Sequence, residues 1–303
     1  MVLLSSREIP QPSGFPGLPQ DWVAEGEHLK ASNGTASLFA INFHRAVSGP
    51  RVLVVFHGMG EYGGRYAHLP HFLKEQVDSV YCPDLRGHGR SEGTRGHIDR
   101  FDSFSEDGAT IIRRLDERLK EQFGKSEIHV LGHSLGGHIV LRTLFLNSEL
   151  PIRSATVSAP FLGIKTQIPA AKKAAVFLLA KLAKAVPLAT DLDADGLSRD
   201  PAVVKLYKED PLNHDKMTPG FFMELLAAFD DTLSRTDGIR VPIQFLIPMA
   251  DRIVEEEKAI AFFDVLKQSD KRLRSYPEFF HEPINEIGKE RVLADILSWI
   301  QSH

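Results

Sequence analysis

The chain has 303 residues, 43% of them hydrophobic and 25% charged, so it can bury a sizeable core and is neither disordered nor of low complexity. Its 36 Lys and Arg residues against 40 Asp and Glu give a net charge of -4, which offers no electrostatic reason to expect a nucleic-acid partner. Cys82 is the only cysteine, which excludes an internal disulfide and any metal site or redox pair built from several cysteines.

The first residues are expected to carry no chemistry. Residues 1–21 are predicted to form an extended lead-in, because residues 10–19 contain four prolines and two glycines that neither pair in a sheet nor continue a helix. The N-terminal apolar run is too short for a signal peptide, and no stretch of the chain is apolar for long enough to span a membrane. We therefore expect a cytoplasmic protein, with contact at a membrane surface left open.

From residue 51 onward, buried strands alternate with helices. Strands are predicted at 51–57, 79–84, 127–133 and 153–159, and helices at 66–76, 101–123 and 135–147. Strands separated by helices of this length require parallel crossover connections. The sequence therefore predicts an α/β fold with a mostly parallel central sheet flanked by helices.

The alternation stops between residues 161 and 236, where helix-like segments follow one another. It resumes with a strand at 241–247, a helix at 254–268, a strand at 272–276 and a terminal helix at 285–301. We interpret residues 161–236 as an inserted helical cap, and residues 22–160 and 237–303 as the core. Such an insertion lies over the carboxyl ends of the strands, where open α/β sheets bind their ligands.

The pattern Gly-x-Ser-x-Gly occurs twice, around Ser91 and around Ser134. A nucleophile elbow needs a buried strand, a sharp turn and then a helix, because the turn holds the serine hydroxyl above the sheet. Ser134 has both flanks, whereas Ser91 lies in a glycine-rich run that favours a loop. Ser134 is the predicted nucleophile, with an ordinary strand-to-helix turn as the alternative.

A serine nucleophile needs a base, and the base needs a carboxylate that orients it. In this fold the two partners follow the serine in the order acid, then histidine. His281 is the predicted base because it follows the strand at 272–276, whereas His214 falls in the insertion and His303 is the last residue. Asp251 follows the strand at 241–247 and is the predicted acid. A surface-exposed loop histidine and a turn-forming aspartate are the alternatives.

The reaction also needs two hydrogen-bond donors for the oxyanion that develops on the substrate. The backbone N–H of Leu135, directly after the nucleophile, is one expected donor. The backbone N–H of Met59, in the glycine-containing loop after the first predicted strand, is the other.

The most distinctive segments of the sequence are His57–Tyr66, Gly87–Gly93, Gly132–Gly137 and Tyr207–Leu212. They resemble the monoglyceride lipases and related lysophospholipases of the α/β-hydrolase superfamily, and the likeness extends over about residues 38–300. The resemblance implies an α/β-hydrolase fold and a serine hydrolase of single-chain acyl esters that needs no metal or organic cofactor.

The resemblance also implies that Glu61, Arg65 and Tyr207 help to shape a polar pocket on the alcohol side of the substrate. The alternative is that Glu61 and Arg65, four residues apart, simply pair at the start of a helix. Monoglyceride lipases typically carry a second histidine three residues after the catalytic one, and Ile284 stands there in this chain. A head group other than glycerol therefore stays open.

A helical projection of residues 171–186 separates apolar from basic side chains. The apolar face gathers Ala175, Leu178, Leu179, Leu182 and Val186, and the opposite face carries Lys173, Lys181 and Lys184 with Phe177 among them. Such a helix can dock on a lipid surface, or its leucines can pack down over the pocket. Both interpretations leave an apolar acyl channel under the cap.

Together these features predict a hydrolase of monoacyl lipids, either a monoacylglycerol lipase or a lysophospholipase, that forms an acyl-enzyme through a Ser-His-Asp triad. Its expected partner is a small amphiphilic lipid ester. One alternative is a carboxylesterase of short soluble esters or a peptidase of the same superfamily. Another is a catalytically silent interaction protein with a hydrolase fold.

Overall fold

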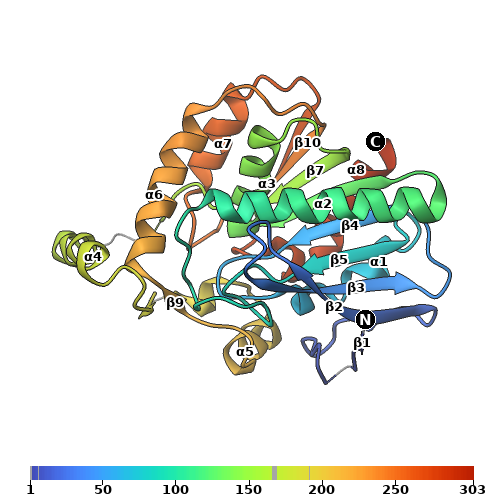
Figure 1. Ribbon diagram of the computed structural model, residues 1–303, viewed down its shortest axis with the longest axis horizontal. Helices are drawn as coiled ribbons and strands as arrows, with labels where there is room; N and C mark the ends of the chain where they lie inside the picture. The colour runs from blue at the N-terminus through green and yellow to red at the C-terminus, as the bar shows by residue number, and fades with distance from the viewer. Residues whose placement is uncertain (1, 6, 166–168, 191) are drawn as a thin grey trace.

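The computed structural model describes residues 2–5, 7–165, 169–190 and 192–303. In these residues nine strands form one central sheet in the spatial order β1-β2-β3-β5-β4-β6-β7-β10-β11 (Figure 1). The strands are β1 (Val2–Leu3), β2 (Trp22–Lys30), β3 (Ser37–Arg45), β4 (Arg51–Phe56), β5 (Ser79–Pro83), β6 (Glu127–His133), β7 (Ile152–Ser158), β10 (Ile243–Pro248) and β11 (Lys271–Tyr276). Every neighbouring pair from β5 to β11 is parallel, and β1, β2 and β3 join antiparallel. The sheet is therefore mostly parallel, as predicted.

Helices cover both faces of the sheet. They are α1 (Leu69–Leu73), α2 (Asp102–Phe123), α3 (Leu135–Leu146), α7 (Glu256–Val265) and α8 (Lys289–Ser302), with short 3-10 helices at Gly63–Tyr66 and Pro283–Asn285. After Arg51, every residue of strand β4 is apolar, because its alternate side chains enter the core on opposite faces. Val54 packs among residues of α2, α3 and α7, whereas Val55 packs among residues of α1 and α8.

The N-terminal part of the sheet contains strands that the sequence pattern did not predict. Strands β2 and β3 form an antiparallel pair that precedes β4, and β5 is the neighbour of β3. Strand β2 alternates between buried and partly exposed residues, which is typical of an antiparallel strand covered on one face. Within the predicted lead-in, Val2 and Leu3 pair with β2 as β1.

The segment between β7 and β10, residues 159–242, contains the residues 161–236 that the sequence predicts as a helical cap, and from here on we call this whole segment the insertion. Its elements are α4 (Ala170–Leu182), β8 (Leu188–Ala189), a 3-10 helix (Ala194–Gly196), α5 (Pro201–Glu209), β9 (Lys216–Met217) and α6 (Pro219–Ser234). The pattern did not predict β8 and β9, which pair antiparallel. Helix α6 packs its Phe221 and Leu225 into the core, whereas α4 projects to the left of the sheet (Figure 1).

Candidate active site

The turn from β6 to α3 holds Ser134 in a strained backbone conformation. Its φ of 52° and ψ of -115° lie where residues with a side chain rarely occur. The backbone N–H of Ser134 donates to the carbonyl of Ser158 at 2.9 Å, and the carbonyl of Ser134 accepts from the N–H of Phe161 at 3.0 Å. The end of β7 therefore fixes the turn from the neighbouring strand.

The two glycines of this motif are required by space. A Cβ atom on Gly132 would lie 2.3 Å from the carbonyl oxygen of Gly136. One on Gly136 would lie 2.0 Å from the carbonyl oxygen of Phe56 in β4. Both contacts are with backbone, which cannot move aside as a flexible side chain can. The geometry is the one a nucleophile elbow needs.

The other serine motif closes a loop. The hydroxyl of Ser91 donates to the carbonyl of Asp84 at 2.6 Å and accepts from the N–H of Phe39 at 2.8 Å. Ser91 is buried between the loop after β5 and strand β3. This is the loop that the glycine-rich sequence predicts.

His281 and Asp251 lie together, in loops that follow β11 and β10. Nδ1 of His281 is 2.7 Å from Oδ2 of Asp251, and the other carboxylate oxygen accepts the N–H groups of Ile253 and Val254 at 2.7 and 3.1 Å. Burial alone would lower the pKa of His281, but the charge of Asp251 and their hydrogen bond raise it above the ordinary value of 6.5. The same ion pair and the two N–H groups lower the pKa of Asp251 against the effect of burial.

A cavity of about 270 Å³ brings Ser134 and His281 into one site. It lies between the carboxyl ends of the strands and the insertion, and Met59 in the loop after β4 also lines it. Its apolar lining includes Phe161, Ile164, Val176, Leu188, Leu192, Leu197, Met217, Pro219, Phe222 and Ile253. Most of this apolar wall belongs to the insertion.

Two backbone N–H groups near Ser134 are available as donors. Within the described residues, neither the N–H of Met59 nor that of Leu135 has a hydrogen-bond partner. Leu135 is the first residue of α3, where N–H groups have no acceptor within the helix and the helix dipole favours negative charge.

A buried ion-pair network lies beside the cavity. Arg65 donates through both terminal nitrogens to the carboxylate of Glu282, at 2.8 Å each, and also pairs with Glu61. The ring of Tyr207 lies under the guanidinium, 5.1 Å from its carbon. Glu61, Tyr207 and Glu282 line the cavity, whereas Arg65 is not among the described residues that do.

Glu282 was missed by the sequence reasoning. It stands directly after the predicted base, but its partner Arg65 is 217 residues away in the chain, so no local pattern connects them. The neighbouring position 284, where the resemblance places a head-group contact, is in the core instead. Ile284 is 2% exposed and packs among Tyr66, Tyr276 and Phe279.

The insertion is tied to the loop that carries His281. The backbone N–H of His281 donates to the carbonyl of Gly196 at 3.3 Å, and the N–H of Glu282 donates to that of Leu197 at 2.8 Å. The carboxylate of Glu286 accepts the N–H groups of Arg199 at 3.0 Å and of Phe280 at 3.1 Å. Residues 196–199 and 280–286 therefore form one hydrogen-bonded unit.

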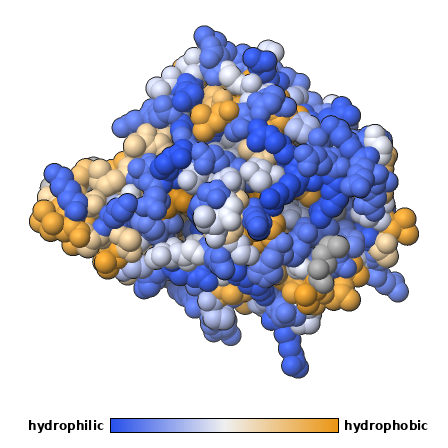
Figure 2. All heavy atoms as spheres, in the orientation of Figure 1, coloured by the Kyte–Doolittle hydropathy of each residue, from blue (hydrophilic) through white to orange (hydrophobic). Residues whose placement is uncertain are grey.

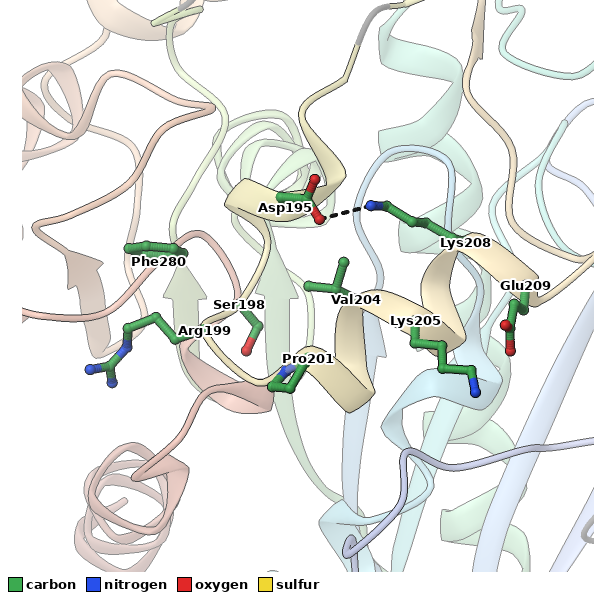
Figure 3. Close-up of a pocket in the computed structure, with 9 residues that line it drawn as sticks. All are labelled: Asp195, Ser198, Arg199, Pro201, Val204, Lys205, Lys208, Glu209 and Phe280. Atoms are coloured by element: carbon green, nitrogen blue, oxygen red, sulfur yellow. Dashed lines mark hydrogen bonds and ion pairs between the residues drawn. The ribbon is translucent and has the colours of Figure 1, made fainter.

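Another pocket, of about 640 Å³, is lined by residues of this unit and of α5 (Figure 3). It is lined by Asp195, Ser198, Arg199, Pro201, Val204, Lys205, Lys208, Glu209 and Phe280. An ion pair between Lys208 and Asp195, at 2.7 Å, lies at its edge. None of the predicted catalytic side chains lines it, so its larger volume does not make it the candidate active site.

No group of three or more His, Cys, Asp or Glu side chains in the described residues is arranged to hold a metal ion. Nor does any helix in the described part of the chain have the length and apolar character needed to cross a membrane.

Comparison with known proteins identifies the family. The model of the family Hydrolase_4, described as serine aminopeptidase, S33, matches residues 49–288. The chain belongs to this family. The Hydrolase_4 match begins just before β4 and ends just before α8, so it includes the insertion and both loops that carry His281 and Asp251.

This Hydrolase_4 member has relatives of known name. It is 33% identical over 257 residues to the monoacylglycerol lipase of Mycolicibacterium smegmatis, covering 83% of this chain and 88% of that protein. It is 26% identical to phospholipase YtpA of Bacillus subtilis, covering 80% of this chain and 91% of that one. The crystal structure of Paleococcus ferrophilus monoacylglycerol lipase superposes with a TM-score of 0.76 at 29% identity, covering 88% of this chain and 99% of that one. The predicted α/β-hydrolase fold is confirmed.

Proposed function

We propose that this Hydrolase_4 member hydrolyses the ester bond of monoacyl lipids, with Ser134 as nucleophile, His281 as base and Asp251 as the residue that orients the base. The observation that carries the proposal is one cavity that contains a serine on a strained elbow, a histidine held by a buried aspartate, and a largely apolar wall. The named relatives support a carboxylic ester hydrolase of this kind.

In the proposed reaction, His281 takes the proton of Ser134 while the serine oxygen attacks the ester carbonyl. The oxyanion accepts hydrogen bonds from the N–H groups of Met59 and Leu135, which are already in place before charge develops. His281 then protonates the departing alcohol, and water repeats the sequence on the acyl-enzyme. Asp251 fixes the imidazole tautomer and stabilises its cation. These steps need no metal or organic cofactor.

The lining of the cavity supports an acyl-chain site. The apolar side chains from the insertion can cover a single alkyl chain, and each methylene that leaves water contributes about 0.8 kcal/mol. Residues 161–236 would then act as a cap over the core formed by residues 22–160 and 237–303. Glu61 and Tyr207, with Arg65 behind them, would border the alcohol side.

Helix α4 supports contact with a membrane surface. Leu178 is 59% exposed and Leu182 is 76% exposed, and Phe177 is also exposed. Val186 is exposed as well, but the helix ends at Leu182, so Val186 lies beyond the apolar face that the projection of residues 171–186 predicts. Figure 2 shows an orange, hydrophobic region at the left of the molecule, where Figure 1 places α4. The leucines of α4 thus face outward, not down over the cavity, while Val176 lines it. Lys181 of the same helix is also exposed, and the side chain of Lys173 lies outside the part of the chain that the structure describes. The cytoplasmic location stays a prediction.

The proposal is tested with a fluorophosphonate probe and a series of monoacylglycerols. We expect the probe to label the wild-type protein but not Ser134→Ala, and kcat/KM to rise as the acyl chain lengthens. Preference for acyl groups shorter than about eight carbons would favour the soluble-ester carboxylesterase instead, because an apolar channel gains affinity with each methylene. Failure of the probe to label an intact protein would favour the catalytically silent alternative.

A further inference from the structure

The terminal nitrogens of Arg65 are already occupied by carboxylates that lie between this cation and the cavity. Both terminal nitrogens donate to Glu282, and one of them also pairs with Glu61. A planar guanidinium recognises phosphate or carboxylate with this same two-pronged edge. Glu61 and Glu282 line the cavity, whereas Arg65 is not among the described residues that do. A ligand in the cavity therefore contacts the two carboxylates before it can reach the guanidinium of Arg65.

The rest of the cavity is also poor in positive charge. Lys216 is the only lysine or arginine among the described residues that line it, and its ammonium pairs with Asp215 at 2.9 Å. Asp193 is a further acidic side chain in the wall. Burial lowers the pKa of His133 to about 4 and also lowers that of His214, so these two rings are neutral near pH 7. The pKa of His281 is raised, but any charge on its ring is paired with the carboxylate of Asp251.

Hydrogen-bonding groups that suit an uncharged alcohol are present. The hydroxyl of Tyr207 is buried and has no partner among the described residues. Glu282 accepts from Arg65 and from the side-chain amide of Asn285 at 2.9 Å, and Glu61 accepts from the hydroxyl of Tyr66 at 2.9 Å. Carboxylate oxygens held in this way still have lone pairs for the hydroxyl groups of a ligand.

We propose that Glu282 is a specificity-determining residue that makes the alcohol side of the cavity reject ester substrates with an anionic head group and accept uncharged or cationic ones. This inference rests on the proposed ester hydrolase function. A phosphate next to the ester would lie close to Glu61 and Glu282 in a site with little water, where like charges repel strongly. Without Glu282, the edge of Arg65 would be free to bind the phosphate.

The test compares three esters with the same acyl chain: 1-decanoylglycerol, decanoylcholine and 1-decanoylglycerol 3-phosphate. Release of decanoate gives kcat/KM for each, so the acyl site contributes equally and only the head group differs. For the wild type we expect the neutral and cationic esters to be hydrolysed at least about 100-fold more efficiently than the anionic one. Hydrolysis of the anionic ester within about threefold of the neutral one would overturn the inference.

Variants assign the effect to Glu282. We expect Glu282→Gln to lower the ratio of neutral to anionic kcat/KM by at least about tenfold. Glu61→Gln should shift the ratio in the same direction, and it provides a second measurement if Glu282→Gln does not fold. Glu278→Gln is the matched control, because Glu278 lies just after β11, pairs outward with Arg291 and loses the same charge. An unchanged ratio in both folded cavity variants, or an equal shift in Glu278→Gln, would contradict the inference.

Failure of the inference is distinguishable from failure of the proposed function. If the wild type hydrolyses none of the three esters and the fluorophosphonate does not label Ser134, the proposed function fails. If 1-decanoylglycerol is hydrolysed and Ser134 is labelled, the ratios alone decide whether Glu282 selects the head group.

Discussion

His281 and Asp251 form a buried pair, with Nδ1 of the imidazole 2.7 Å from a carboxylate oxygen. Because the neutral imidazole must accept the serine proton, and because Asp251 raises its pKa, kcat/KM should fall as the pH drops through a value above 6.5.

The variant Asp251→Asn tests this relationship. Without the carboxylate, its charge and hydrogen bond no longer raise the pKa of His281 against the effect of burial, so the acid limb of the pH profile should move to lower pH. Turnover should fall by about 10⁴ because the imidazole loses its orienting partner. The measurement is kcat/KM for a monoacyl ester from about pH 5 to about pH 9. An acid limb that stays in place would show that Asp251 does not control the base.

The strain at Ser134 gives a prediction that separates stability from activity. Ser134→Ala keeps the Cβ atom and should leave the unfolding free energy nearly unchanged, while turnover falls by about 10⁶. Ser134→Gly should also be inactive, but it should gain about 1 kcal/mol in the free energy of unfolding, because glycine tolerates a φ of 52°. Urea unfolding of the two variants side by side is the measurement. Equal stability of both would mean that the turn stores no strain.

The close approach at Gly136 predicts a steric effect. Gly136→Ala places a methyl group 2.0 Å from the carbonyl oxygen of Phe56, so it should lower the free energy of unfolding by about 3 kcal/mol and slow fluorophosphonate labelling. Gly17→Ala is the control, since nothing lies within 4 Å of a Cβ at that position. Comparable losses in both variants would argue against a site-specific clash.

Position 284 tests the location of the head-group site. Ile284→His would bury an imidazole among apolar side chains and should cost about 3 kcal/mol in the free energy of unfolding without improving hydrolysis of a glycerol ester. Ile287→His changes an exposed residue of the same loop and is the matched control. Faster hydrolysis of a monoacylglycerol by a fully stable Ile284→His variant would show that this side chain reaches the alcohol.

The exposed face of α4 predicts binding to lipid vesicles. The double variant Leu178→Glu, Leu182→Glu should weaken sedimentation with vesicles of phosphatidylcholine and phosphatidylglycerol by at least about tenfold, because two large apolar side chains no longer enter the interface. Val47→Glu, at an exposed position in the turn between β3 and β4, is the control. Unchanged sedimentation of the double variant would remove α4 as the docking element.

The sequence predicted the parallel part of the fold because buried parallel strands are continuous apolar runs with helices between them. It also placed Ser134, Asp251 and His281 after the predicted strands at 127–133, 241–247 and 272–276. In the structure His281 contacts Asp251, and Ser134 and His281 line one cavity. Their catalytic roles stay a prediction.

Other features could not be read from local patterns. Strand β2 carries alternating polar residues, so it lacks the apolar run that marked the parallel strands. Strand β3 contains four consecutive apolar residues, 38–41, but no helix separates it from β4, so the alternation of strands and helices did not reveal it. The ion pair between Arg65 and Glu282 joins residues that are 217 positions apart in the chain, and no rule of local spacing connects positions so far apart. The periodicity of α4 defines an apolar face, but it does not say whether that face meets protein or solvent.

The hydrogen bonds from the N–H groups of His281 and Glu282 to the carbonyls of Gly196 and Leu197 have a consequence for the design of chimeras. A chimera that takes residues 161–236 from a relative would replace the acceptors of the His281 and Glu282 amides. If residues 280–286 are exchanged together with residues 161–236, the hydrogen-bond donors and their acceptors come from the same protein. Crossover points chosen in this way should transfer chain-length preference between homologues without displacing the imidazole.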